Sequence, residues 1–192
     1  MTERAGGGHV LLVIDMLIDF FEQERRLAAI RAELTSRINA LARAFRVHDR
    51  PIIWVRQEFR PDLQDAFLEM RQHDRRVTIA GTRGCLLLPE LERMAGDFEI
   101  VKKRYSAFFG TSLDELLAGL RPSALVLAGI NTHACVRTTA IDAYQRDYQV
   151  ILARQCIGSY DREHHDITLR YLANKTRFLS NDEVASLLAA SA

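Results

Sequence analysis

The chain has 192 residues, of which 48% are hydrophobic and 27% are charged, and its formal net charge is +1. This length suits one compact domain, and the balanced charge gives no reason to expect nucleic acid or an anionic membrane as a partner. Three widely spaced cysteines, no visible secretory signal and no apolar run long enough to span a membrane favour a cytoplasmic protein without disulfides.

The predicted elements alternate between strand and helix. We expect a loose tail over residues 1–8 and a single domain over 9–192. In chain order, the first half of this domain is expected to have a strand at 10–14, a helix at 34–45, a strand at 52–55, a short helix near 63–70, a strand at 100–101 and a helix at 111–120. The second half is expected to have a strand at 124–128, a helix at 135–146, a strand at 150–153, a helix at 162–173, a strand at 177–179 and a last helix after 181. This alternation predicts an α/β fold with a mainly parallel sheet and helices on both faces. Ligands bind such sheets beyond the carboxyl ends of the strands.

Cys135 is a candidate nucleophile because it follows the predicted fourth strand at the point where a helix begins. The N–H groups at a helix start favour a thiolate and can receive an oxyanion. The alternative for an isolated cysteine is a small buried core residue, which is how we interpret Cys85 and Cys156.

Two charged residues end other strands of the predicted sheet. Asp15 follows the first strand, where a carboxylate can exchange protons, and Lys102 closes the third, where an ammonium can stabilise nearby anions. Taken singly, Asp15 can also be a turn cap and Lys102 a surface lysine. Their joint placement with Cys135 at one edge of the sheet is the stronger signal.

Three segments of the chain, VIDMLIDF (13–20), KKRYSAF (102–108) and GINTHACVRTTAIDA (129–143), resemble the signature segments of isochorismatase-like cysteine hydrolases. That family includes N-carbamoylsarcosine amidase, nicotinamidase and ureidoacrylate hydrolase. The resemblance implies a three-layer α/β/α sandwich around a six-stranded parallel sheet, and homo-oligomers, either dimers or tetramers. It also implies an Asp15-Lys102-Cys135 triad, in which the family pattern selects Lys102 over Lys103.

The activity that the resemblance implies is hydrolysis of a small amide or ureido compound through a thioester on Cys135. A cis Ile130–Asn131 bond typical of the family would aim the N–H groups of Asn131 and Cys135 at the oxyanion. One alternative is isochorismatase chemistry, in which Asp15 acts as general acid on a vinyl ether. Another is a non-catalytic binding or assembly protein on the same fold.

No cofactor is expected. Nicotinamidases carry an Asp-x-His metal site after the second strand, but residues 54–61 of this chain contain no histidine, and we interpret the adjacent His164 and His165 as surface residues. We therefore predict no catalytic metal.

The substrate contacts are the least constrained part of the prediction. An apolar wall and polar groups are expected from Phe20, Trp54, Gln57, Tyr105 and Phe108, and a carboxylate clamp from Arg56, Arg60 and Arg83. The arginine-rich stretch 71–76 is interpreted as a solvated loop of unknown role.

Overall fold

A computed structural model describes residues 7–190. The strands in this part are β1 (His9–Ile14), β2 (Ile52–Gln57), β3 (Phe98–Lys102), β4 (Ala124–Gly129), β5 (Gln149–Ile157) and β6 (Arg177–Leu179). The helices are α1 (Ile18–Gln23), α2 (Arg25–Val47), α3 (Leu68–Gln72), α4 (Leu113–Leu120), α5 (Arg137–Tyr144), α6 (Arg162–Leu172) and α7 (Asn181–Ala190). Most of the expected tail, residues 1–6, lies outside the described residues. The carbonyl oxygens of Gly7 and Gly8 accept hydrogen bonds from the N–H of Ser123.

The six strands form one sheet in the order β3-β2-β1-β4-β5-β6, and every neighbouring pair is parallel. The predicted parallel sheet is confirmed. β1 and β4 are buried along their whole length, as expected for apolar strands covered on both faces. The connections leave in opposite directions from β1 and β4, so the crevice between their carboxyl ends is where a ligand is expected.

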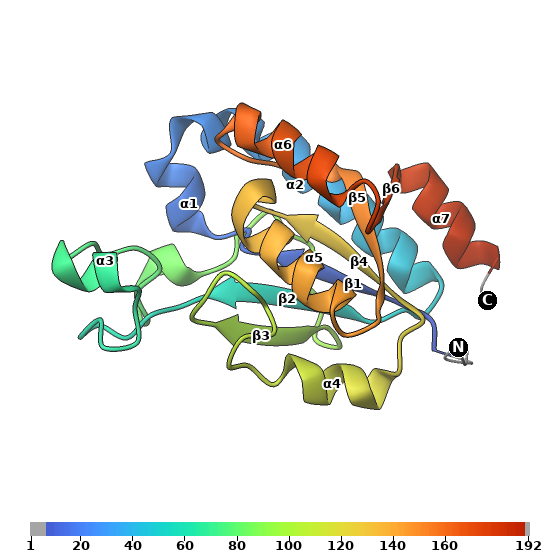
Figure 1. The fold of residues 1–192 in the computed structure, drawn as a ribbon, viewed down its shortest axis with the longest axis horizontal. Helices are drawn as coiled ribbons and strands as arrows, with labels where there is room; N and C mark the ends of the chain where they lie inside the picture. The colour runs from blue at the N-terminus through green and yellow to red at the C-terminus, as the bar shows by residue number, and fades with distance from the viewer. Residues whose placement is uncertain (1–6, 191–192) are drawn as a thin grey trace.

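Helices cover both faces of the sheet, which confirms the three-layer α/β/α sandwich (Figure 1). Alternation along β1 divides the core: Leu11 and Val13 join the residues of α1, α2 and α7, whereas Val10, Leu12 and Ile14 join those of α4, α5 and α6. Within residues 7–190, no helix is long and apolar enough to cross a membrane.

Three local features differ from the prediction. The six-residue helix α1 was not expected, and the short helix expected near 63–70 is α3, at Leu68–Gln72. β5 continues to Ile157, so Gln155 and Cys156 lie within this strand and not after it. β5 is therefore longer than its apolar segment alone suggested.

Candidate active site

The fold brings Asp15, Lys102 and Cys135 together at the carboxyl edge of the sheet. The Nζ atom of Lys102 lies 2.7 Å from Oδ2 of Asp15 and 3.5 Å from Sγ of Cys135. Lys102 ends β3, and its side chain passes over the neighbouring β2 to reach Asp15 beyond β1. The backbone of Asp15 turns sharply out of β1, with φ of 54°, while its N–H still donates to Val55 O at 2.8 Å.

Lys102 is fully buried, and its ammonium group contacts three acceptors. Besides Asp15 and Cys135, these include the carbonyl oxygen of Arg104, at 3.0 Å. Burial alone would lower the pKa of Lys102, but the charges of Asp15 and Cys135 outweigh burial and raise it above its ordinary value. Lys102 therefore carries its positive charge at neutral pH. The adjacent Lys103 turns away and pairs with Asp65 at 3.1 Å.

Cys135 lies in a π-helical turn, Thr132–Val136, immediately before α5. Burial, reinforced by the negative charge of Asp15, raises the pKa of its thiol to about 12 despite the opposing effect of Lys102. The thiol is thus protonated at neutral pH. Burial and a neighbouring carboxylate therefore oppose the thiolate that the start of a helix was expected to favour.

The backbone before Cys135 is tightly constrained. The Ile130–Asn131 peptide bond is cis, and Gly129 has φ of 109°. A Cβ atom on Gly129 would lie 2.0 Å from Ile14 O, so only glycine fits. In this turn, the N–H of Thr132 bonds to Gly158 O, and those of Ala134 and Val136 bond to Asn131 O. None of these bonds uses the N–H of Asn131 or Cys135.

A cavity of about 720 Å³ opens beside Cys135. Among the expected substrate contacts, Phe20, Gln57 and Tyr105 line it, as do Asn131 and Cys135 themselves. Its walls are formed by α1, by the start of α2, by α3 together with the loops that flank it, and by the turn before α5. A small molecule bound there would contact both apolar rings and polar groups.

Trp54 and Phe108 do not line this cavity, so their assignment as substrate contacts was wrong. Trp54 is fully buried on the α2 side of the sheet, and its Nε1–H donates to Oδ2 of Asp97 at 2.8 Å. Phe108 is buried beneath α5 and stacks on Tyr148. Both rings are part of the core.

The expected arginine clamp was also wrong. Arg56 is held by Glu58 and Glu99, and the exposed Arg60 and Arg83 pair with Asp62 and Glu22. None of the three arginines lines the cavity.

Several cavity residues were missed by the sequence reasoning, and Arg75, His133 and Arg137 are among them. Arg75 belongs to the stretch that we interpreted as a solvated loop. His133 and Arg137 flank Cys135 at two residues on either side, and this proximity was a signal that could have identified them.

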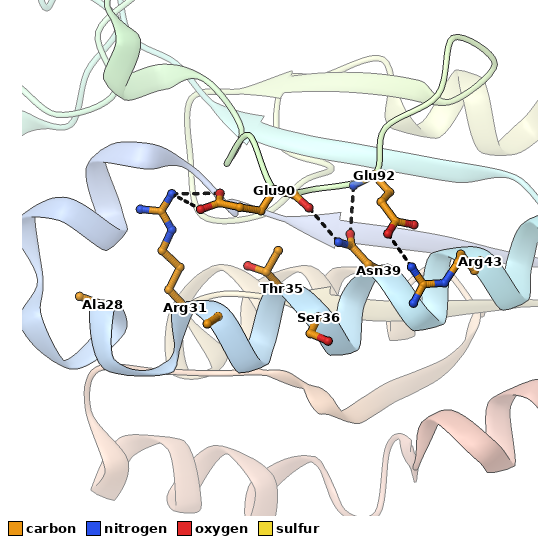
Figure 2. Close-up of a pocket in the computed structure, with 9 residues that line it drawn as sticks. Ala28, Arg31, Thr35, Ser36, Asn39, Arg43, Glu90 and Glu92 are labelled. Carbon is orange, nitrogen blue, oxygen red and sulfur yellow. Dashed lines mark hydrogen bonds and ion pairs between the residues drawn. The ribbon is translucent and has the colours of Figure 1, made fainter.

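A second depression, drawn in Figure 2, runs along α2 and lies apart from Asp15, Lys102 and Cys135. Its charged groups are already paired: Arg31 with Glu90 at 2.7 Å, and Arg43 with Glu92. Asn39 Nδ2 donates to the carbonyl oxygen of Glu90 at 2.8 Å. This surface therefore serves to attach the 90–92 segment to α2.

Among residues 7–190, no three histidine, cysteine or acidic side chains come together as a metal site. His164 pairs with Asp161 on the surface, at 2.8 Å. Cys85 and Cys156 are buried, and Cys156 lies within the core. That the chain works without a metal or other cofactor stays a prediction.

Comparison with known proteins agrees with this geometry. The family model of the isochorismatase domain matches residues 9–183. The uncharacterized isochorismatase family protein YaaI of Bacillus subtilis is 27% identical over 165 residues, which cover 85% of this chain and 88% of that protein.

Two solved structures are similar over nearly their full length. N-carbamoylsarcosine amidase of Thermoplasma acidophilum is 28% identical with a TM-score of 0.77, over 92% of this chain and 98% of that one. Nicotinamidase/pyrazinamidase PncA of Bacillus subtilis is 25% identical with a TM-score of 0.80, over 90% of this chain and 100% of that one. The chain thus belongs to the isochorismatase family, as its three sequence segments predicted, and has the fold of the isochorismatase-like hydrolases.

Proposed function

We propose that the protein is a cysteine hydrolase that cleaves a C–N bond of a small amide or ureido compound through a thioester. The observation that carries this proposal is the buried Lys102 ammonium, which contacts both Asp15 and Cys135, and Cys135 lines a cavity. The similarity to an amidase and a nicotinamidase supports the same class of reaction.

The first half of the reaction is attack by Cys135. Because the raised pKa keeps the proton on Sγ, Asp15 takes that proton as sulfur bonds to the substrate carbonyl carbon. The N–H groups of Asn131 and Cys135 receive the oxyanion, and Lys102 balances the negative charge in the site. Asp15 then gives its proton to the departing nitrogen, which leaves as ammonia or an amine.

The second half regenerates the thiol. Water attacks the thioester carbonyl while Asp15 accepts one of its protons. The C–S bond breaks, the proton passes to Sγ, and the carboxylic or carbamic acid leaves. One water is consumed in each turnover, and no oxidant, reductant or cofactor is required.

The test is ammonia release from a panel of small amides and ureido compounds. Cys135→Ala is expected to lower the best rate by orders of magnitude, with circular dichroism showing an intact fold. Cys85→Ala, the matched control, should stay near wild type, because Cys85 is buried away from the cavity. A thioester adduct on Cys135 in rapidly quenched samples would support the mechanism, and an unchanged rate in Cys135→Ala would refute it.

Isochorismatase chemistry is the second candidate, because the matching family model describes an isochorismatase domain. A protonated Asp15 would act there as general acid and would not need the thiol. This candidate requires pyruvate release from isochorismate that survives Cys135→Ala and is lost in Asp15→Asn.

A further inference from the structure

His133 lies in the cavity wall but has no part in the proposed triad chemistry. It is two residues before Cys135 in the same π-helical turn. Its ring packs edge-on against Tyr160, with centroids 5.0 Å apart, and its Nδ1 lies 2.7 Å from Oγ of Ser159. The ring is therefore held in one orientation from two sides.

The surrounding hydrogen bonds determine which ring nitrogen carries the proton. The Ser159 hydroxyl donates to the carbonyl oxygen of Asp161 at 3.0 Å and accepts from the N–H of Asp161 at 3.0 Å. With its only proton used on that carbonyl, Ser159 can only accept from His133. If the hydroxyl donated to Nδ1 instead, the Asp161 carbonyl would lose this donor. All three bonds form only when Nδ1 of His133 is protonated, so in the neutral ring Nε2 is the nitrogen without a proton.

His133 is neutral at pH 7. Burial lowers its pKa, and the nearby His164, His165 and Arg137 lower it further, against the opposing charge of Asp161. Nε2 therefore carries a lone pair, and no group in the described part of the chain donates a hydrogen bond to it. His133, which lines the same cavity as Cys135, thus has a ring acceptor without a partner among the described residues.

We infer that Nε2 of His133 accepts a hydrogen bond from an N–H on the acyl side of the substrate, so that ureido compounds are preferred over simple amides. This inference rests on the proposed function. In that mechanism, the carbonyl oxygen binds the N–H groups of Asn131 and Cys135, and the departing nitrogen interacts with Asp15. The donor that remains in a ureido compound, and that a simple amide lacks, is the second N–H.

Ethylurea and butyramide are the probes, because they have the same shape and differ by one NH in place of CH₂. Their dissociation constants are measured by NMR titration with wild type, His133→Gln and His133→Asn. Glutamine places an amide near the position of Nε2, whereas asparagine matches only Nδ1 and keeps the contact with Ser159. The preference for ethylurea is the dissociation constant of butyramide divided by that of ethylurea. This ratio should be about tenfold larger for wild type and His133→Gln than for His133→Asn.

An ethylurea-to-butyramide ratio that is the same in all three proteins, or no binding of ethylurea, would overturn the inference. Nitrogen-15 spectra of the histidine rings give a test independent of binding: they should show His133 protonated on Nδ1, and protonation on Nε2 instead would also overturn it. Failure of the proposed function is a separate result. It would appear as turnover that survives Cys135→Ala, whatever the binding ratio.

Discussion

Replacing Lys102 with methionine tests the centre of the site, because methionine keeps most of the buried stem and removes the charge. In the wild-type protein, the ammonium is fully buried and lies 2.7 Å from a carboxylate whose side chain is 1% exposed. The variant would leave Asp15 charged, buried and without its cation. Breaking a buried ion pair in this way costs about 3–5 kcal/mol of the free energy of unfolding.

Lys103→Met is the matched control. Lys103 is the next residue in the chain, but its side chain is 35% exposed and its ion pair with Asp65 lies at the surface. A pair of this kind contributes about 0–1 kcal/mol. Turnover should follow the same order: Lys102→Met is expected to lose orders of magnitude in rate, and Lys103→Met to stay within a few fold of wild type.

The assay is urea unfolding of the two single variants and of the double variant Asp15→Asn/Lys102→Met. The double variant holds no unpaired buried charge, so it should be more stable than Lys102→Met alone although it carries one more substitution. Equal losses for Lys102→Met and Lys103→Met, or a double variant less stable than Lys102→Met, would refute the reasoning.

Three further outcomes are expected. Iodoacetamide should alkylate Cys135 before Cys85 or Cys156, because Cys135 is the one of the three that lines the cavity. The rate of alkylation of Cys135 should rise about tenfold per pH unit between about pH 7 and 10, since the thiolate is the reactive form and the pKa of the thiol is about 12. A rate that reaches a plateau near pH 7, measured by mass spectrometry, would contradict this. Trp54→Phe should lower the free energy of unfolding by about 1–3 kcal/mol without changing KM, whereas Tyr105→Ala should raise KM. The reverse pattern in denaturation and kinetics would disprove the placement of Trp54 in the core and of Tyr105 in the cavity wall. Light scattering is expected to report a homo-oligomer, and a mass of 21.9 kDa at micromolar concentration would exclude it.

The sheet could be predicted from the sequence because its central strands are covered on both faces. Such strands are short all-apolar runs, as at Val10–Ile14, and they stand out from the polar connections. α1 could not be predicted in the same way. It has six residues and no side-chain hydrogen bond at its start, so neither periodicity nor capping marks it.

The positions of Asp15, Lys102 and Cys135 were predictable for a similar reason, since each follows or ends a strand of one parallel sheet. The cavity lining was not. Trp54 lies within β2 and Gln57 ends it, but both faces of that strand are covered, so composition cannot tell on which face either side chain lies. Ion pairs made by arginines with distant residues, such as Arg56 with Glu99, depend on tertiary contacts that no local pattern contains.

The burial that surrounds Asp15, Lys102 and Cys135 also restrains the proposed nucleophile. A cysteine in a wet, positively charged site is a thiolate at rest, and it reacts with alkylating agents and oxidants as readily as with substrate. Here burial and the charge of Asp15 raise the pKa of the Cys135 thiol, although Lys102 lies 3.5 Å away. On the proposed mechanism, the thiolate forms only as a carbonyl comes within reach and its oxyanion is received by backbone N–H groups. Selectivity for a carbonyl substrate would then come from the same buried carboxylate that accepts the proton.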